Sequence, residues 1–377
     1  MKNSFNKIHE ESIQNPEEFW KNVSDDVFWF KKPTKILNKS TPPFYKWFED
    51  GVTNTCYNAV DIHIDNGKGD KTALIYDSPI TNNKAKYTYN ELREKISKFA
   101  GALDNQGVKK GDRVIIYMPM IPEAVIAMLA CGRIGAIHSV VFGGFASNEL
   151  ASRIDDSKAK ILITASCGFE PGRTVEYRPL VDGALRLAKH KVEKVILFQR
   201  KDHEVKLNSP LEISWQEALS NAKHKDCVEI GSNEFAYILY TSGTTGIPQG
   251  IVRDVGGHIV ALKWTMKNIY NIDESDVWWS ASDIGWIVGH SYIVYAPLFK
   301  GCTTVLFEGK PVGTPDAGVF WRIISEYKIK SLFTAPTAFR AIKKEDPDGQ
   351  FFSKYDLSSF KSLFLAGERA DPDTIKW

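Results

Sequence analysis

The chain of 377 residues carries a net charge of +2 at pH 7, with 43% hydrophobic and 25% charged residues, as is typical of a soluble globular protein. Basic residues are interspersed with acidic ones, which argues against a nucleic-acid partner, and no apolar run is long enough to predict a membrane span. The length allows two or more subdomains and favours an enzyme.

The N-terminus and the cysteines indicate a cytoplasmic protein. The first twenty residues, MKNSFNKIHEESIQNPEEFW, are polar and acidic, unlike a signal or transit peptide. The five cysteines are scattered without a CxxC pair, which suits a reducing compartment and supports neither a zinc site nor a disulfide framework. These cysteines are Cys56, Cys131, Cys167, Cys227 and Cys302.

Residues up to about Ile64 show weak periodicity and many turn residues. We expect an irregular segment that wraps over another domain, because its large aromatic side chains need burial. These side chains are Trp20, Trp29, Phe44, Trp47 and Phe48.

From Thr72 onward, predicted strands alternate with predicted helices. Thr88 and Glu91 form a capping-box pair in front of a helix with one apolar face, and Pro122 can open the next helix. The strand runs, in chain order, are TALIY, RVIIYM, IHSVVF, KILITA, KVILF, FAYILY, TTVLF, KSLF and KSLFLAG. Apolar strands separated by helices predict an α/β fold of mostly parallel sheets covered by helices.

Ligands of such sheets bind beyond the carboxyl ends of the strands, where the sequence places YTSGTTG and LAGER. The segment Tyr240–Gly250 reads YTSGTTGIPQG and does not match a P-loop, because Pro248 and Gln249 stand where glycine and lysine are due. Its glycine amides and hydroxyl groups are still suited to wrap a polyphosphate. The alternative interpretation is a surface turn.

The order TSGTTGxPxG after a buried strand resembles the signature of the adenylate-forming enzymes, the acyl-CoA synthetase and luciferase-like superfamily. Nearly the whole chain is similar to their short-chain acyl-CoA synthetases, and the later blocks resemble propionyl-CoA synthetases more than acetyl-CoA synthetases. The matching blocks are KWFEDGVTNTCYNAVDIHI, SVVFGGFASNELASRI, SDIGWIVGHSYIVYAPLFKG, FEGKPVGTPDAGVFW, LFTAPTAFRAI and LAGERADPDT.

The resemblance implies an N-terminal extension of the acetyl-CoA synthetase type, residues 1–64, and an AMP-binding domain, residues 65–377. It implies a ligase that uses ATP with Mg²⁺, and CoA as co-substrate. A short carboxylate, with propionate or acetate foremost, attacks the α-phosphate to give acyl-AMP and pyrophosphate, and the CoA thiol then displaces AMP. The partners expected are therefore small molecules, and the oligomeric state stays open.

The resemblance also implies four groups of binding residues. Arg369 and Gln249 depart from the family's proline and lysine, and Glu170 stands where a second CoA-binding arginine is usual. Without the family context, an ordinary turn is the better explanation of Gly367–Arg369 and plain core that of Trp286–Val288, and a solvated loop residue explains Arg173 equally well. The groups are Thr241, Ser242, Gly243, Thr244, Thr245 and Gly246 for the ATP phosphates; Gly367, Glu368 and Arg369 for adenine; Trp286, Ile287, Val288 and Ala366 for the acyl group; and Phe142, Gly143, Gly144 and Arg173 for CoA.

We assign no catalytic residue and no metal ligand within the chain. His290 is interpreted as structural, because the attacking carboxylate is already ionised at neutral pH. The family's ribose aspartate and catalytic lysine lie beyond the LAGER block, so we expect a chain that ends at Trp377, before the small C-terminal domain, to be inactive alone. A non-catalytic nucleotide- or CoA-binding module is the alternative function.

Overall fold

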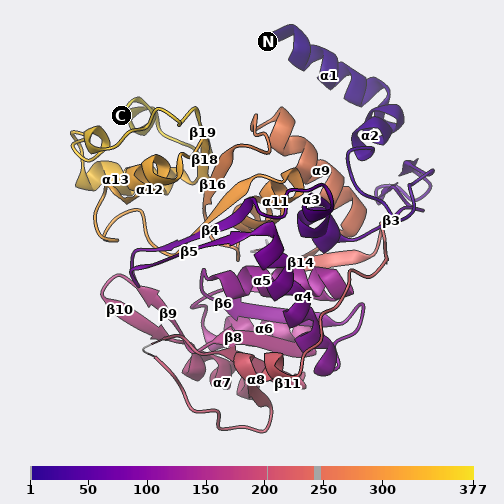
Figure 1. The fold of residues 1–377 in the computed structure, drawn as a ribbon, viewed down its shortest axis with the longest axis vertical. Helices are drawn as coiled ribbons and strands as arrows, with labels where there is room; N and C mark the ends of the chain where they lie inside the picture. The colour runs from indigo at the N-terminus through magenta and orange to yellow at the C-terminus, as the bar shows by residue number, and fades with distance from the viewer. Residues whose placement is uncertain (1, 202, 242–247) are drawn as a thin grey trace.

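A computed structural model describes residues 2–201, 203–241 and 248–377. Two large sheets form the centre of the molecule, and helices lie around and between them (Figure 1). The N-terminal helices α1 (Lys2–Gln14) and α2 (Pro16–Ser24) project from one side, and α1 extends away from the sheets (Figure 1). In the described ranges, no helix combines the length and the apolar character that a bilayer crossing requires.

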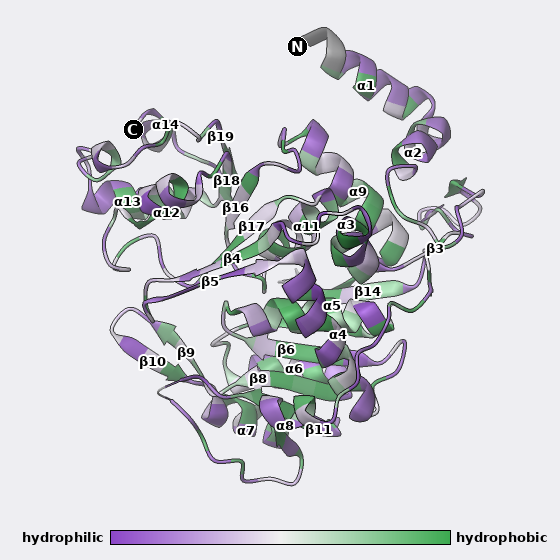
Figure 2. Ribbon diagram, in the orientation of Figure 1, coloured by the Kyte–Doolittle hydropathy of each residue, from purple (hydrophilic) through white to green (hydrophobic). Residues whose placement is uncertain are grey.

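The first large sheet has seven strands in the order β12-β11-β8-β6-β7-β14-β15, all parallel except for the antiparallel pair β14–β15. Its inner strands β6 and β8 consist mostly of hydrophobic residues (Figure 2). The strands are β6 (Arg113–Met118), β7 (Ile137–Phe142), β8 (Ile161–Ala165), β11 (Lys194–Phe198), β12 (Glu212–Ser214), β14 (Phe235–Thr241) and β15 (Gln249–Asp254).

The second large sheet has six strands in the order β19-β18-β16-β17-β4-β5, and only β4–β5 is antiparallel. Three two-stranded ribbons complete the strands: β1–β2, β3–β13 and β9–β10. The strands are β4 (Thr72–Ser78), β5 (Asn83–Thr88), β16 (Val277–Ala281), β17 (Thr303–Phe307), β18 (Ser331–Thr334), β19 (Ser362–Leu365), β1 (Leu37–Asn38), β2 (Lys46–Trp47), β3 (Val52–Thr53), β9 (Cys167–Glu170), β10 (Arg173–Glu176) and β13 (Ile230–Gly231).

Helices cover the sheets, because strands with apolar side chains on both faces must be shielded from water. The neighbours Trp278 and Trp279 of β16 point to opposite faces, one into a cluster with Met266 and the other onto Phe320. The helices are α3 (Ile62–Asp65), α4 (Tyr89–Asn105), α5 (Pro122–Ile134), α6 (Ser147–Ser157), α7 (Tyr177–Leu187), α8 (Trp215–Ser220), α9 (Val255–Asn268), α10 (Ile287–Gly289), α11 (Ala296–Lys300), α12 (Val319–Tyr327), α13 (Pro336–Glu345) and α14 (Pro372–Lys376), with the irregular helices η1 (Tyr57–Asp61), η2 (His290–Tyr295) and η3 (Phe352–Lys354).

A helical layer lies between the two sheets. Helix α4 contacts β4 and β5 of the six-stranded sheet and packs on α5, which lies on β6 and β7 of the seven-stranded sheet. The capping box is confirmed, because Thr88 accepts from the amide of Glu91 and the Glu91 carboxylate accepts from the amide of Thr88. Pro122 opens α5, as predicted.

The expected α/β architecture with mostly parallel, helix-covered sheets is confirmed. The expectation of an irregular N-terminal segment is wrong for its beginning, because α1 and α2 are regular helices. Burial holds for Trp29 and Phe48, but Phe44 is 80% exposed, because it lies in the turn between β1 and β2.

A buried ion pair joins the two sheets. The Arg200 guanidinium, just after β11, donates to both oxygens of Glu308, just after β17, at 2.8 and 3.1 Å. The Tyr76 hydroxyl of β4 also donates to Glu308, and the guanidinium lies 4.8 Å from the centre of the Phe169 ring. Both charged side chains are buried, so each provides the other with the counter-charge that burial requires.

We predict that Arg200→Leu destabilises the protein by about 3–5 kcal/mol, because Glu308 would be left as an unpaired buried charge. The free energy of unfolding from urea titrations measures the effect. Lys328→Ala is the control, since the Lys328–Asp356 pair is exposed on both sides and should change stability within experimental error. Equal losses in the two variants would contradict this role of the buried pair.

Candidate active site

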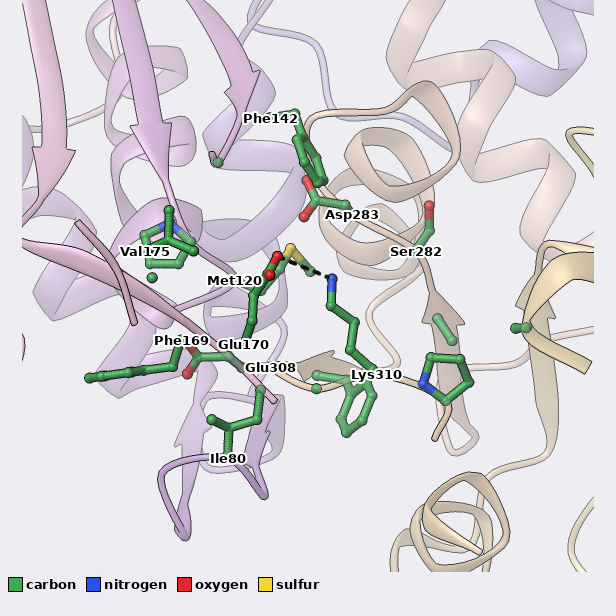
Figure 3. A pocket seen from close by; sticks show the side chains of 18 of the residues that line it. Ile80, Met120, Phe142, Phe169, Glu170, Val175, Ser282, Asp283, Glu308 and Lys310 are labelled. Carbon is green, nitrogen blue, oxygen red and sulfur yellow. Dashed lines mark ion pairs between the residues drawn. The ribbon is translucent and has the colours of Figure 1, made fainter. Parts of the chain in front are cut away.

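A cavity of about 230 Å³ lies where strands of both large sheets end. Its wall includes residues just beyond the carboxyl ends of β6 and β7 from one sheet and of β16 and β17 from the other. The β9–β10 ribbon contributes a third side, and side chains from all three point toward the space between them (Figure 3). The sequence pattern predicts a binding site at this edge of parallel sheets.

Two of the predicted CoA residues, Phe142 and Gly143, line this cavity. A Cβ atom on Gly143 would lie 2.2 Å from the hydroxyl oxygen of Tyr177 and 3.0 Å from the carbonyl oxygen of Met118. Glycine is therefore required at this position by close packing. Gly144 is exposed and has φ +93°, a conformation that favours glycine.

The predicted acyl residue Trp286 lies beside Phe142, with 5.6 Å between their ring centres. The structure thus brings one predicted acyl residue next to a predicted CoA residue. Trp286 is 46% exposed and Ile287 is 48% exposed. By contrast, Val288 and Ala366 pack against a separate apolar cluster that includes Trp278 and Phe333 of the six-stranded sheet. The four predicted acyl residues therefore fall into two pairs.

Asp283 is a cavity residue that the sequence analysis did not assign, although it lies in the SDIGWIVGH block. The amide of Gly285 donates to its Oδ1 at 2.7 Å. Burial raises the pKa of Asp283 to about 6, against the opposing effects of the Gly285 amide and of Lys310. Gly289 permits the tight loop, because a Cβ there would lie 1.9 Å from the carbonyl oxygen of Asp283.

The predicted CoA residue Arg173 is paired with Glu170 across the β9–β10 ribbon. Arg173 Nη2 lies 2.6 Å from Glu170 Oε2, and the Arg173 side chain is 68% exposed. Lys310 approaches the same carboxylate, with 3.9 Å between Lys310 Nζ and Glu170 Oε1 (Figure 3). Lys310 lies in the FEGKPVGTP block but carried no predicted role. Glu170 thus lies between two cations at the cavity's rim.

The predicted adenine residues Gly367, Glu368 and Arg369 form an exposed turn just after β19. Gly367 has φ +97°, which explains glycine at the turn. The Glu368 carboxylate accepts from Arg340 of α13. The turn therefore lies beyond the carboxyl end of a parallel strand, and its role in adenine binding stays a prediction.

The predicted phosphate loop falls mostly outside the described residues, which exclude Ser242, Gly243, Thr244, Thr245 and Gly246. Thr241 is the last residue of β14 and pairs in register with Gln249, the first residue of β15. The loop therefore joins two antiparallel strands, and Gln249 belongs to a strand. Phosphate binding by this segment stays a prediction.

His290 is buried in η2 beside His138 of β7. Their Nε2 atoms are 3.1 Å apart, and the Tyr295 hydroxyl lies 3.0 Å from His138 Nε2. Burial lowers the pKa of His290 well below its usual value, so the imidazole is neutral at physiological pH. This environment supports the interpretation of His290 as structural.

The family model described as AMP-binding enzyme matches residues 63–377, so the chain belongs to the AMP-binding enzyme family. The model described as acetyl-coenzyme A synthetase N-terminus matches residues 5–59. The division of the chain at residue 64 stays a prediction.

Among proteins of known name, this chain is similar to acyl-CoA synthetase short-chain family member 3, mitochondrial, of Rattus norvegicus, with 54% identity over 97% of this chain and 54% of that protein. It is 42% identical to propionate--CoA ligase of Escherichia coli over 99% of this chain and 59% of that protein. The structure of acetoacetyl-CoA synthetase from Streptomyces lividans superposes with a TM-score of 0.88 at 25% identity, over 98% of this chain and 56% of that one. The chain thus spans about half the length of the relatives it matches.

We predict that Gly143→Ala destabilises the protein by about 1–3 kcal/mol, because its methyl group would overlap the Tyr177 hydroxyl. In a Tyr177→Phe background, most of this loss should disappear. Urea unfolding of the two single variants and the double variant measures the coupling between the positions. Gly144→Ala is the matched control: it has open space around it but a positive φ, so Tyr177→Phe should leave its cost unchanged. Additive effects at positions 143 and 177 would refute the packing argument.

We predict that Asp283 makes the protein less stable as pH rises from about 4 to about 6. The folded state holds the Asp283 proton more tightly than the unfolded state does, since the pKa of Asp283 is raised to about 6. The resulting stabilisation is complete below the pKa of the unfolded state and is lost as pH rises through about 6. Asp283→Asn should remove about 1–2 kcal/mol of this decline. Unfolding free energies between pH 4 and pH 7.5 measure it, and parallel pH profiles for the variant and the wild type would count against it.

Proposed function

We propose that this chain forms the substrate-binding part of an ATP-dependent, AMP-forming short-chain acyl-CoA ligase, with propionate as the leading substrate. The observation that carries the proposal is the cavity that joins Phe142 and Gly143 of one sheet to Asp283 and Lys310 of the other. The relatives, which are acyl-CoA synthetases and a propionate--CoA ligase, support the same activity.

In the proposed reaction, a carboxylate oxygen attacks the α-phosphorus of ATP, and pyrophosphate leaves. The CoA thiol then attacks the acyl carbon of the acyl-AMP, and AMP leaves. The first step needs no general base, since a short carboxylic acid is ionised at neutral pH. This chain's proposed contribution is to bind and orient the substrates, and the donors of residues 241–246 are proposed to stabilise the leaving pyrophosphate.

We assign CoA binding to the rim formed by Arg173, Lys310 and Glu170. A CoA phosphate would compete with the Glu170 carboxylate for the two cations, whose distances from it are 2.6 and 3.9 Å. Because Arg173 and Lys310 are substantially exposed, exchange of Glu170 for a phosphate is inexpensive. This exchange explains how an acidic residue can occupy a position where an arginine is usual.

We further propose that Mg²⁺ accompanies ATP. Two of the cavity carboxylates do not suit a bound cation, because Glu308 is bonded to Arg200 and Glu170 to Arg173. No step is therefore assigned to the ion through these residues. When bound to ATP, Mg²⁺ would neutralise part of the negative charge on the phosphates.

The experiment that tests the function uses the longest form of the protein that its native gene encodes. We expect AMP and pyrophosphate release that depends on propionate and CoA, with weaker activity on acetate and butyrate. Failure of every short acid to support AMP release by a folded protein that binds ATP would favour the alternative, a non-catalytic nucleotide- or CoA-binding module.

We predict that Ala366→Val in this form lowers kcat/KM for propionate by about 10- to 100-fold, because the added methyl groups narrow an apolar site that holds one extra methylene. The value for acetate should change much less. Ala370→Val, four positions further in the same turn, is the matched control, and kinetics on both acids measure the ratio. An equal loss on both acids would show that Ala366 does not select chain length.

A further inference from the structure

Two cysteines that are far apart in the sequence, Cys56 and Cys227, lie close together beside the β3–β13 ribbon. The antiparallel ribbon β3–β13 pairs Thr53 with Ile230. Cys56 lies three residues after Thr53, and Cys227 lies three residues before Ile230, so the chain direction brings both to the same end of the ribbon. Their sulfur atoms and a carboxylate oxygen of Asp61 all lie within 4.8 Å of one another.

The surroundings of the two thiols distinguish them from the other cysteines of the chain. The Cys227 thiol donates to Asp61 Oδ2 at 3.6 Å, and Arg133 Nη1 lies 3.4 Å from the Cys56 sulfur. The guanidinium thus contacts the Cys56 sulfur, whereas the Asp61 carboxylate contacts the Cys227 sulfur. Cys56 is fully buried, whereas Cys227 is partly exposed. Cys227 is therefore the less buried residue of the two.

The same contacts argue against a divalent cation at this cluster. Arg133 donates to both oxygens of Asp61, at 2.7 and 3.0 Å. The carboxylate charge is thus already neutralised, and a cation bound by Asp61 would meet the guanidinium. Two thiols beside a neutralised carboxylate are better suited to bond with each other.

We propose that Cys56 and Cys227 are an oxidisable thiol pair, which a peroxide converts into a disulfide. A Cys227 thiolate attacks one peroxide oxygen and becomes a sulfenic acid, while the other oxygen leaves as hydroxide and is protonated to water. The Cys56 sulfur then attacks the Cys227 sulfur, the S–O bond breaks, and the departing hydroxide takes the Cys56 proton as a second water. The two thiols lose two electrons, which the peroxide accepts.

Closure of the disulfide requires a local movement of the segment that carries Cys227. A disulfide requires the sulfur atoms to approach to about 2 Å, and the segment 222–229 that carries Cys227 contains no helix or strand among the described residues. Burial raises the pKa of the Cys227 thiol, so the pair resists weak oxidants at neutral pH and reacts faster as pH rises. The bond would fix the segment after β3 to the AMP-binding part of the chain.

The test treats the folded full chain with hydrogen peroxide, blocks the remaining thiols with N-ethylmaleimide, and maps unreduced peptides by mass spectrometry. We expect the Cys56 and Cys227 peptides to be joined, with a mass about 2 Da below the sum of the reduced peptides. Dithiothreitol should reverse the link, and the oxidised protein should melt several degrees higher. The buried Cys131, Cys167 and Cys302 serve as internal controls and should stay alkylatable after unfolding.

Cys227→Ser is the matched variant, because serine keeps a donor toward Asp61 at a partly exposed position. It should fold with the wild-type circular dichroism spectrum, form no linked peptide and show no rise in melting temperature on oxidation. Oxidation of Cys227 to a sulfinic acid without a link in folded wild-type protein would overturn the proposal. So would equimolar zinc binding that protects both thiols from alkylation.

Discussion

The Arg200–Glu308 pair fixes how the two large sheets meet, and the cavity depends on that meeting. Each side chain comes from the residue stretch just after a parallel strand, one from each sheet. Because both charges are buried, neither sheet can move away without exposing or orphaning a charge. Glu308 itself lines the cavity. The interaction that holds the sheets together therefore also forms part of the candidate active site.

Close backbone packing gives the cavity its second constraint. Gly143 and Gly168 both approach the Tyr177 hydroxyl, and Gly285 lies against the backbone of Phe142. Residues from β7, the β9–β10 ribbon and the loop after β16 are thus held at distances that a Cβ atom would prevent. Rigid support of this kind is what positions substrates within a fraction of an ångström.

The sequence predicted the elements whose signals are local. The Thr88–Glu91 cap, the opening Pro122 and the apolar parallel strands each follow from a few neighbouring residues, and the structure has all of them. Strands β5, β15 and β16 were missed. The first two contain polar residues or lie at a sheet edge, whereas β16 is a buried inner strand that reads VWWSA. Such edges are often protected by lysine, and β5 reads NKAKYT. Phe44 was wrongly expected to be buried, since the aromatic character of a residue does not show whether other residues cover the turn in which it lies.

The candidate site was predictable only where the family resemblance supplied it. Phe142 and Gly143 line the cavity, and Trp286 lies beside Phe142; the binding roles of all three stay predictions. Lys310 and Asp283 were missed although both lie in recognised blocks, because their roles follow from contacts across the cavity. The pairing of Arg200 with Glu308, and of Cys56 with Cys227, joins positions far apart in the chain. No local pattern in one sequence reports such contacts.

The ion pairs around the cavity are of two kinds: one is buried and permanent, and the others are exposed and exchangeable. Glu308 accepts from Arg200 where neither is exposed, and this pair has no reason to open when an anion enters. Glu170 holds Arg173 and Lys310 at the rim, where both cations are substantially exposed, so each contact contributes less than about 1 kcal/mol. A phosphate offers more acceptors than one carboxylate oxygen and binds a guanidinium strongly. An entering polyanion can therefore displace Glu170 and gain two cations, while the connection between the sheets stays intact.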